Sequence, residues 1–300
     1  MKRLLITGAT GFIGHRFISF LKPSDYEVRI LSRKKHPVYE TIVCDLQLEN
    51  IPEDTLKGID IVFHLAGLAH DLSDSTKIEK LYREVNVNAT VRLAELASRH
   101  GVQHFIFLSS VKAGGSVLSE KCLTEDDQME PEGVYGKTKR EAELELLDID
   151  KRSTMQISII RSSLVYGPGV KGNLRLMLSS IEKWWFPPLP EINNRLSMIH
   201  VDDLAKALLL VSANYRTNGE IYIATDAETY SSRKIYEAMC DLSGKTVPSW
   251  SVPKFIFDFL ALISPRKRYQ LEKLFRDECY SSSKLESLGF CAKYSIKDWS

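Results

Sequence analysis

The sequence predicts an α/β fold in which a doubly wound parallel sheet is followed by a smaller C-terminal lobe. Short apolar runs, typical of strands buried on both faces, alternate with stretches of helical periodicity. A glycine-rich turn joins the first apolar run to the first helical stretch. After Gly167-Pro168-Gly169 the alternation loosens, which indicates that a second unit begins there.

The elements follow in order along the chain. Apolar runs predict strands near residues 3–7, 27–32, 41–44, 59–65, 104–109, 156–163 and 220–224. Helical spacing of apolar residues predicts helices near 12–22, 77–100, 135–149, 174–184, 202–213, 232–243 and 253–263. We expect one domain over residues 1–168, to which segment 196–224 returns, and a second lobe over 169–195 and 225–300. Connections that cross between the two would place a cleft over the carboxyl ends of the strands.

Three glycines shape the turn after the first strand. Gly8 permits a tight turn, Gly11 lets the backbone approach a pyrophosphate, and Gly14 lets the next helix pack closely on the sheet. The N-terminus of that helix adds free N–H donors and the positive end of a dipole. Because a strand precedes this turn and a helix follows it, the turn predicts a Rossmann-type site for a dinucleotide.

Composition excludes several classes of protein. The 300 residues include 40 Lys and Arg against 39 Asp and Glu, with no basic stripe that would bind nucleic acid. No apolar stretch reaches the ~18 residues of a membrane span. The histidines show no metal-ligand spacing, so we expect no metal site. We also expect no disulfide framework, and instead reduced, buried thiols of a cytoplasmic protein at Cys44, Cys122, Cys240, Cys279 and Cys291.

A tyrosine and a lysine stand four residues apart in the predicted helix 135–149. This spacing places Tyr135 and Lys139 on one face of the helix. A free phenol has a pKa of ~10 and is a poor base at neutral pH. Positive charge from Lys139 and from an oxidised nicotinamide would favour the phenolate. Together with the dinucleotide turn, the pair predicts hydride transfer on a nicotinamide, with the tyrosine moving the proton.

Several short segments match one pattern when they are read together. They are Thr7-Gly8-Ala9-Thr10-Gly11-Phe12-Ile13-Gly14, Cys44-Asp45-Leu46, His64-Leu65-Ala66-Gly67, Asn86-Val87-Asn88-Ala89-Thr90, Ser109-Ser110, Tyr135-Gly136-Lys137-Thr138-Lys139, Val165-Tyr166-Gly167-Pro168-Gly169 and His200-Val201-Asp202-Asp203-Leu204. In these segments the chain resembles the extended short-chain dehydrogenase/reductase superfamily, in its NAD-dependent epimerase/dehydratase branch, which includes UDP-glucose and UDP-N-acetylglucosamine 4-epimerases. The resemblance covers nearly the whole chain and implies a substrate-binding role for the smaller C-terminal lobe.

The resemblance implies roles for individual residues. Tyr135 would be the acid/base, Lys139 would support it, and Ser110, preferred over Ser109, would hydrogen-bond the reacting oxygen. The cofactor would contact Gly8, Thr10, Gly11, Phe12, Ile13, Gly14, Ser32, Arg33, Asp45, Leu46, Leu65, Ala66, Gly67, Asn86 and Lys139. The substrate would contact Ser109, Ser110, Tyr135, Asn173 and Arg195. A homodimer would form through the helices 77–100 and 135–149.

One departure from the family pattern concerns the cofactor. Many NAD-dependent members end the second strand with an Asp that binds the ribose hydroxyls of the adenosine. Here Ser32 and Arg33 stand at that place. An uncharged residue beside a guanidinium suits a ribose 2′-phosphate, so NADP is favoured over NAD, and both remain open.

Other departures concern the substrate. The 4,6-dehydratases place Asp-Glu directly after the catalytic serine or threonine, whereas this chain has Val111-Lys112, which argues against dehydration. The sequence here is similar to bacterial 4-epimerases and 4-ketoreductases of surface polysaccharides; no role follows for Lys112. The usual Arg-Pro after the sixth strand reads Arg161-Ser162. In the family an arginine shortly before His-Val-Asp-Asp often binds the sugar diphosphate, and Arg195 lies one place away from that position.

We therefore expect a nucleotide-sugar 4-epimerase that acts on a UDP-hexose or UDP-N-acetylhexosamine. The alternatives are an NADPH-dependent 4-ketoreductase, a 4-epimerase of a polyprenyl-diphosphate-linked sugar and, more remotely, a non-catalytic NADP-sensing protein. The apolar segments 184–190 and 255–263 fit either core packing or peripheral contact with an anionic membrane, because Arg266-Lys267-Arg268 follows the second of them.

Overall fold

The computed structural model describes residues 1–69, 76–115, 121–131, 133–263, 271 and 274–299. Its centre is a sheet in the order β3-β2-β1-β4-β5-β6-β9, in which every neighbouring pair is parallel. The strands are β1 (Lys2–Thr7), β2 (Tyr26–Ser32), β3 (Glu40–Val43), β4 (Ile61–His64), β5 (His104–Ser110), β6 (Gln156–Ser162) and β9 (Glu220–Ala224). The order reverses between β1 and β4, which is where a doubly wound sheet has its ligand crevice. The predicted fold class is confirmed.

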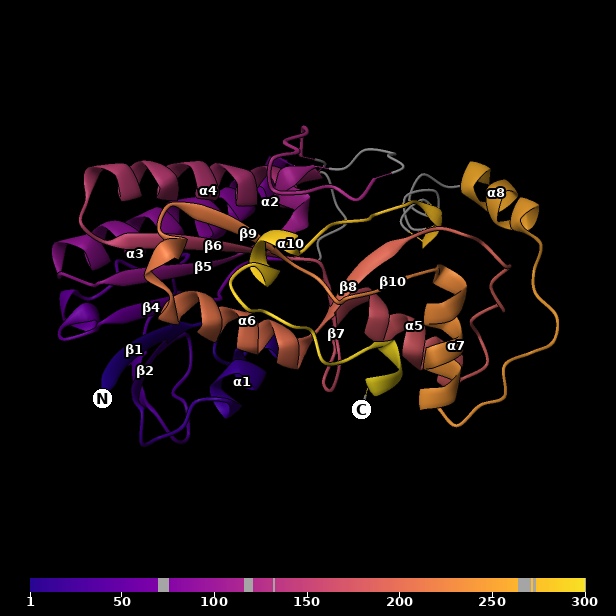
Figure 1. The fold of residues 1–300 in the computed structure, drawn as a ribbon, viewed down its shortest axis with the longest axis horizontal. Helices are drawn as coiled ribbons and strands as arrows, with labels where there is room; N and C mark the ends of the chain where they lie inside the picture. Colours follow the sequence, from indigo (N-terminus) through magenta and orange to yellow (C-terminus); the bar gives the residue numbers. More distant parts are fainter. Residues whose placement is uncertain (70–75, 116–120, 132, 264–270, 272–273, 300) are drawn as a thin grey trace.

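Helices cover both faces of this main sheet (Figure 1). On one face lie α1 (Phe12–Ser19) and α6 (Val201–Ala213), and on the other lie α3 (Ala89–Arg99) and α4 (Gly133–Arg152). Leu4 and Ile6 of β1 pack in the cluster with α1 and α6, whereas Leu5 packs in the cluster with α3 and α4. Alternate side chains of β1 are therefore buried on opposite faces, which explains why Leu4, Leu5 and Ile6 form a continuous apolar run.

The predicted helix 77–100 contains a π-helical turn. It consists of α2 (Thr76–Arg83), the π segment Glu84–Asn88 and α3. Such turns are rare and often occur at functional sites. Asn86 lies in this turn, and its side chain is buried. Apolar periodicity does not reveal an insertion of one residue, so the sequence predicted a single helix.

A second unit contains a three-stranded sheet in the order β10-β8-β7. Its elements are β7 (Leu164–Tyr166), α5 (Gly172–Glu182), β8 (Leu196–His200), β10 (Thr229–Tyr230), α7 (Ser232–Leu242) and α8 (Lys254–Ile263). Tyr166, Leu178, Met198 and Tyr236 pack in its core. Within segment 196–224, α6 and β9 belong to the main unit, while β8 pairs with β7 and β10. The division into two domains at the expected boundaries stays a prediction.

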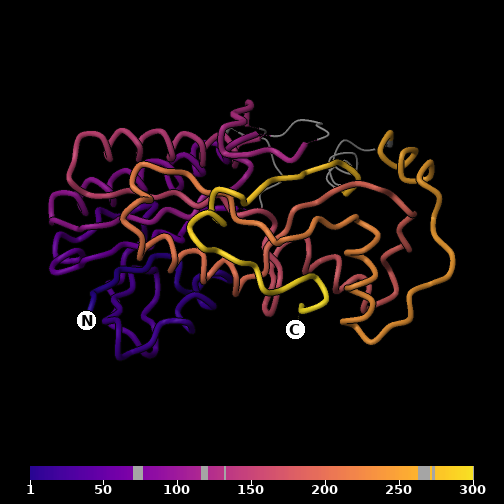
Figure 2. Tube along the Cα trace, in the orientation of Figure 1, coloured from indigo at the N-terminus to yellow at the C-terminus, as the bar shows by residue number. Residues whose placement is uncertain are grey.

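The C-terminal stretch runs back across the molecule, as the yellow tube in Figure 2 shows. After α10 (Ser283–Glu286), which contacts β9, the chain turns back towards the second unit. Leu285 and Phe290 pack in the core of the main unit, whereas Ile296 and Trp299 pack in the core of the second. This stretch therefore joins the two units through side chains.

Two of the five cysteines form a disulfide, so the expectation that all are free thiols is wrong at Cys122 and Cys279. They are separated by 157 residues, and no local spacing marks them as a pair. Backbone hydrogen bonds align their segments, because Leu123 N donates to the Cys279 carbonyl at 2.9 Å. Cys44 and Cys240 are free and buried, and Cys291 is free but exposed rather than buried.

Several large apolar residues of the second unit are exposed. Phe255, Phe259 and Leu262 on one face of α8 are 69%, 64% and 82% exposed, and Trp184 and Trp185 are 65% and 80% exposed. Core packing of these segments is therefore incomplete. The basic run at 266–268 lies outside the described residues. Within the described ranges, no helix combines the length and the apolar character needed to cross a bilayer.

Candidate active site

The glycine turn forms a narrow cradle at the start of α1. Gly8 has a positive φ of 73°, and a Cβ at this position would lie 2.6 Å from Ala66 N. Gly11 N donates to the Gly8 carbonyl at 2.9 Å, and Gly11 is the N-cap of α1. A Cβ at Gly14 would overlap the backbone of Gly8. The cradle therefore requires glycine, and it presents the N–H groups of a helix N-terminus as a pyrophosphate would need.

The residues predicted to contact the adenosine follow the neighbouring strands. Ser32 ends β2, its hydroxyl donates to the Lys34 carbonyl at 2.5 Å, and Arg33 is exposed. Asp45 follows β3, half-buried, and accepts a hydrogen bond from Gln47 N at 3.0 Å. Because β2 and β3 are parallel neighbours, Ser32 and Asp45 lie at the same edge of the sheet.

The segment after β4 is held by polar side chains on both sides. Thr7 Oγ1 accepts from Ala66 N at 3.1 Å and lies 2.7 Å from His64 Nδ1. On the other side, Asn86 Oδ1 accepts from Leu68 N at 2.8 Å. His64 is fully buried, and burial lowers its pKa to about 3, so the imidazole is neutral. The sequence analysis assigned a role to Asn86 but none to Thr7 and His64, although each begins a segment that matches the family pattern.

Ser110, Tyr135 and Lys139 lie together beside this segment. Ser110 ends β5, and Tyr135 is in the first turn of α4, where the Ser110 hydroxyl is near enough to lower the pKa of the phenol. Lys139 Nζ donates to the Leu108 carbonyl at 2.6 Å. A Cβ at Gly67 would lie 3.9 Å from Lys139 Nζ, so the β4 segment and the lysine are close neighbours. The structure thus brings the three predicted residues together next to the predicted cofactor segment.

Burial shifts the pKa values of both titratable members. Burial raises the pKa of Tyr135 to about 12; the hydrogen bond with Ser110 opposes this, and Tyr82 and Glu143 add to it. Burial lowers the pKa of Lys139 to about 7, while Glu143 opposes that change. The phenol is therefore protonated at neutral pH unless further positive charge lies beside it.

A buried ion pair lies one helical turn beyond Lys139. Glu143 accepts hydrogen bonds from Arg161, from Nε at 3.0 Å and from Nη2 at 2.6 Å, and both side chains are 1% exposed. The hydroxyl of Ser109 also donates to Glu143. Ser109 and Ser110 therefore point to different neighbours, and Ser110 is the serine that contacts Tyr135. The sequence offered no signal for Glu143.

The other two predicted substrate contacts lie in the second unit. Asn173 is exposed in the first turn of α5. Arg195 directly precedes β8; its backbone N–H donates to Asp277 Oδ1 at 2.7 Å, and its guanidinium lies 3.6 Å from Asp277 Oδ2. Arg195 is thus held by a carboxylate that sequence reasoning did not identify.

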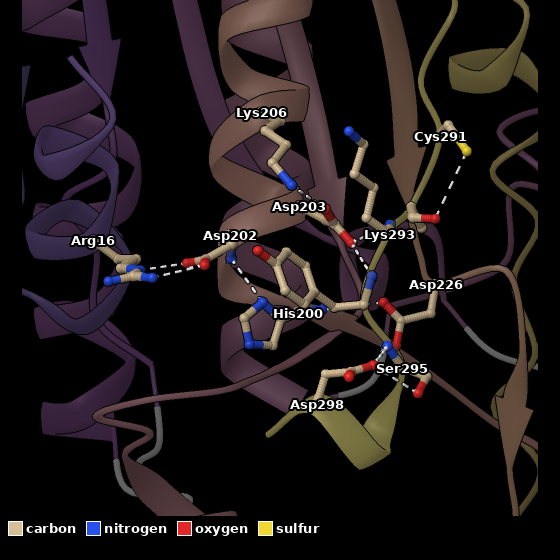
Figure 3. A network of polar contacts seen from close by, with 12 residues as sticks. Arg16, His200, Asp202, Asp203, Lys206, Asp226, Cys291, Lys293, Ser295 and Asp298 are labelled. Atoms are coloured by element: carbon tan, nitrogen blue, oxygen red, sulfur yellow. Dashed lines mark hydrogen bonds and ion pairs between the residues drawn. The ribbon is translucent and has the colours of Figure 1, made fainter. Parts of the chain in front are cut away.

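The segment around His200 connects three parts of the chain (Figure 3). Asp202 accepts a hydrogen bond at 2.7 Å from Nη2 of Arg16, which belongs to α1. His200 Nδ1 accepts from Asp202 N at 3.2 Å, and Asp203 Oδ2 accepts from the backbone of Lys293 at 2.7 Å. These contacts fix α1, α6 and the C-terminal stretch to one another, which agrees with a structural role for this segment.

Comparison with known proteins places this geometry in a family. Residues 4–224 match the model of the NAD dependent epimerase/dehydratase family, which covers the cradle, the Ser110–Tyr135–Lys139 cluster and all of the main sheet beyond its first residues. The chain belongs to this family. It is accordingly an NAD-dependent enzyme of the extended short-chain dehydrogenase/reductase superfamily.

Individual members of the epimerase/dehydratase family are similar at low identity. A UDP-glucose 4-epimerase of Vibrio cholerae is 32% identical over 261 residues, covering 84% of this chain and 78% of that one. An N-acetyl-alpha-D-glucosaminyl-diphospho-ditrans,octacis-undecaprenol 4-epimerase of Escherichia coli O157:H7 is 25% identical, covering 98% and 91%. A UDP-glucuronic acid 4-epimerase of Bacillus cereus, solved with UDP-glucuronic acid and NAD, superposes with a TM-score of 0.80 at 21% identity, covering 99% and 96%. The family is thus certain, while these names differ in substrate.

Proposed function

We propose that this epimerase-family enzyme interconverts the C4 epimers of a UDP-hexose or UDP-N-acetylhexosamine. The observation that supports this most directly is the grouping of Ser110, Tyr135 and Lys139 at the carboxyl end of β5. The absence of an acid pair after Ser110, where Val111 and Lys112 stand, argues against dehydration. The Vibrio relative carries the name of the same class of reaction.

The residues for the dinucleotide are those of the cradle and the strand ends. The N–H groups at Gly11, Phe12 and Ile13 would bind the pyrophosphate, and the segment Leu65–Gly67 would lie along the nicotinamide ribose. The further contacts, as predicted, are Gly8, Thr10, Gly14, Ser32, Arg33, Asp45, Leu46, Asn86 and Lys139. When bound, the nicotinamide accepts the hydride from the sugar C4 and returns it.

Proton movement is the task of Tyr135. Its phenolate removes the proton of the C4 hydroxyl, while Ser110 hydrogen-bonds the same oxygen. Because burial raises the pKa of Tyr135 to about 12, the phenolate needs positive charge nearby, which Lys139 and an oxidised nicotinamide supply. The 4-keto sugar would turn over in the site, and Tyr135 would return the proton to the C4 oxygen once hydride is added to the other face.

The sugar oxygen is assigned to Ser110 rather than Ser109. Ser109 is buried, and its hydroxyl donates to Glu143. Ser109 therefore would not contact the sugar directly, and it would act on the substrate site only through its hydrogen bond with Glu143. Asn173 and Arg195 are the residues of the second unit that we assign to the diphosphate, and Arg195 would exchange part of its contact with Asp277 for a phosphate oxygen.

Proton NMR of UDP-N-acetylglucosamine and UDP-glucose incubated with the purified protein tests the proposal. The galacto epimer of one sugar should appear, first without added cofactor and then with NAD or NADP. Tyr135→Phe should reduce the rate by at least a hundredfold, whereas the exposed Tyr215→Phe should leave it unchanged. Full activity of Tyr135→Phe would contradict the assignment of the acid/base.

A 4-ketoreductase that uses NADPH is the second candidate, and the exposed Arg33 after β2 supports it. The same Ser110, Tyr135 and Lys139 would reduce a 4-keto sugar once per turnover. An epimerase recycles its cofactor, whereas a reductase consumes one NADPH for each product. Stoichiometric loss of NADPH absorbance with a 4-keto sugar, together with no epimerisation, would establish the reductase.

A lipid-linked sugar is a third substrate class, supported by the named substrate of the Escherichia coli relative and by the exposed face of α8. Phe255, Phe259 and Leu262 on that face would rest at a membrane surface. Co-sedimentation with anionic vesicles tests this contact. Phe255→Ser/Phe259→Ser should abolish sedimentation, and no binding by the unaltered protein would remove the membrane contact.

Location and assembly are also part of the proposal. We place the enzyme in the cytoplasm, in the biosynthesis of surface polysaccharides, as a homodimer through α2–α3 and α4. Leu144 on α4 is 58% exposed, and a groove lined by Val87 and Val91 lies beside the same helices. Light scattering of the purified protein tests the dimer, and Leu144→Glu should weaken it.

A further inference from the structure

The backbone of Lys112 contacts both Ser110 and the turn of α4 that carries Tyr135. It belongs to the short turn Val111–Gly114 that follows β5, and its N–H donates to Ser110 Oγ at 3.3 Å. Its carbonyl faces the start of α4, because a Cβ at Gly136 would lie 2.6 Å from Lys112 O. Gly136 directly follows Tyr135. A displacement of Lys112 would therefore change the position of the Ser110 hydroxyl relative to Tyr135.

The side chain of Lys112 extends to the second unit. Its ammonium forms an ion pair with Glu278, and the two side chains are 24% and 19% exposed. Ion pairs with this degree of burial are screened by salt less than pairs at an open surface. The pair connects residues that are 166 positions apart in the chain.

Glu278 is in turn fixed to the segment that carries Arg195. Its N–H donates to the Arg195 carbonyl at 2.8 Å, and its carbonyl accepts from Ser197 N at 2.8 Å. The preceding residue, Asp277, binds both the backbone and the guanidinium of Arg195. One short stretch, 277–278, thus contacts both the turn after Ser110 and the arginine that we assign to the diphosphate.

We propose that Lys112 and Glu278 are positioning residues whose ion pair holds the Ser110 hydroxyl in register with the diphosphate-binding segment at Arg195. The inference rests on the proposed function for its effect on turnover. We assign neither residue a contact with the reacting atoms. The disulfide Cys122–Cys279 and the bonds of Leu123 connect the same two stretches farther along, so Lys112 supplies the link that is nearest to Ser110.

The test is a charge-exchange cycle in the enzyme with its cofactor. Lys112→Met and Glu278→Gln should each lower kcat by about tenfold to a hundredfold, with cofactor content unchanged. The exchanged variant Lys112→Glu/Glu278→Lys should recover most of that loss, because the pair is restored with reversed charges. Lys254→Met is the matched control. It removes an exposed ion pair with Asp258 in α8 of the second unit and should leave kcat unchanged.

A second readout needs no sugar. Backbone amide hydrogen exchange over residues 110–114 should be faster in Lys112→Met and Glu278→Gln than in the unaltered protein, and near normal in the exchanged variant. Faster exchange that the exchanged variant reverses, in a protein that converts no sugar, would support the coupling and contradict the proposed function. Unchanged exchange and kcat in the single variants, or losses that the exchanged variant does not reverse, would overturn the inference.

Discussion

The ammonium group of Lys139 lies over the ring of Phe107, with Nζ 3.8 Å from the ring centroid. It also donates to the Leu108 carbonyl at 2.6 Å, so both contacts come from β5, the strand that ends at Ser110. Burial here lowers the pKa of Lys139 to about 7. The sheet thus holds a weakly hydrated cation beside the phenol of Tyr135, where its charge favours the phenolate.

The first prediction concerns stability as a function of pH. The folded pKa of Lys139, about 7, is below its ordinary value of 10.5, so the unfolded chain binds more protons between these values. The free energy of unfolding should therefore rise with pH across this window, at up to ~1.4 kcal/mol per pH unit. Lys139→Met should show a shallower rise between pH 7 and 9 in urea titrations.

The measurement stops at pH 9 so that Tyr135 does not contribute. Its pKa is raised from 10 to about 12, so it lowers the free energy of unfolding only as the pH rises above about 10. Lys137→Met is the control, since Lys137 is exposed on the same helix. It should keep the slope of the unaltered protein. Equal slopes for Lys139→Met and the unaltered protein would show that Lys139 keeps its proton in the folded state.

The second prediction concerns the pair of Glu143 and Arg161. Because both side chains are 1% exposed, removing one partner leaves an unpaired buried charge. Glu143→Leu should lower the free energy of unfolding by ~3–5 kcal/mol, and Glu143→Leu/Arg161→Met should recover most of the loss. Urea unfolding measures both. Asp148→Ala is the control, because it removes an exposed ion pair with Arg152. It should lower the free energy of unfolding by less than ~1 kcal/mol.

A double variant that is no more stable than Glu143→Leu would contradict the explanation that the loss comes from an unpaired buried charge.

The third prediction concerns the disulfide. Cys122–Cys279 closes a long loop, and a crosslink of that kind stabilises a fold by roughly 2–4 kcal/mol. Dithiothreitol should therefore lower the melting temperature of the unaltered protein. The Cys122→Ser/Cys279→Ser variant should melt at the lower temperature with or without the reductant. The same response to dithiothreitol in that variant would assign the effect to another cause.

The sequence was sufficient for the main sheet because its inner strands β4, β5 and β6 are almost wholly buried and read as largely apolar runs. The pairing of Ser110 with Tyr135 came from the resemblance to the family, because no local spacing joins a residue at the end of β5 to one at the start of α4. Local pattern did not reveal β7, β8 or β10, the strands of the second unit, which have three, five and two residues. Nor did it reveal Cys122–Cys279 or Lys112–Glu278, because partners so far apart in the chain meet only through the fold.

The last prediction concerns the choice of cofactor. Arg33 is exposed at the end of β2, beside Ser32, where a carboxylate would repel a 2′-phosphate. If the guanidinium binds that phosphate, Arg33→Asp should weaken NADPH binding by about tenfold to a hundredfold, the usual effect of losing a charge-assisted hydrogen bond. NADH binding should change far less, because NADH lacks the phosphate. Fluorescence titration of the purified protein with each nucleotide measures both constants.

Lys35→Asp is the matched control, since Lys35 is an exposed cation two residues farther along the same turn. A general electrostatic effect would weaken NADPH binding equally in both variants, whereas a specific contact is lost only in Arg33→Asp. Tighter binding of NADH than of NADPH by the unaltered protein would contradict the NADP preference. That outcome would mean that residues other than Arg33 bind the adenosine ribose. It would also favour the epimerase over the NADPH-dependent reductase.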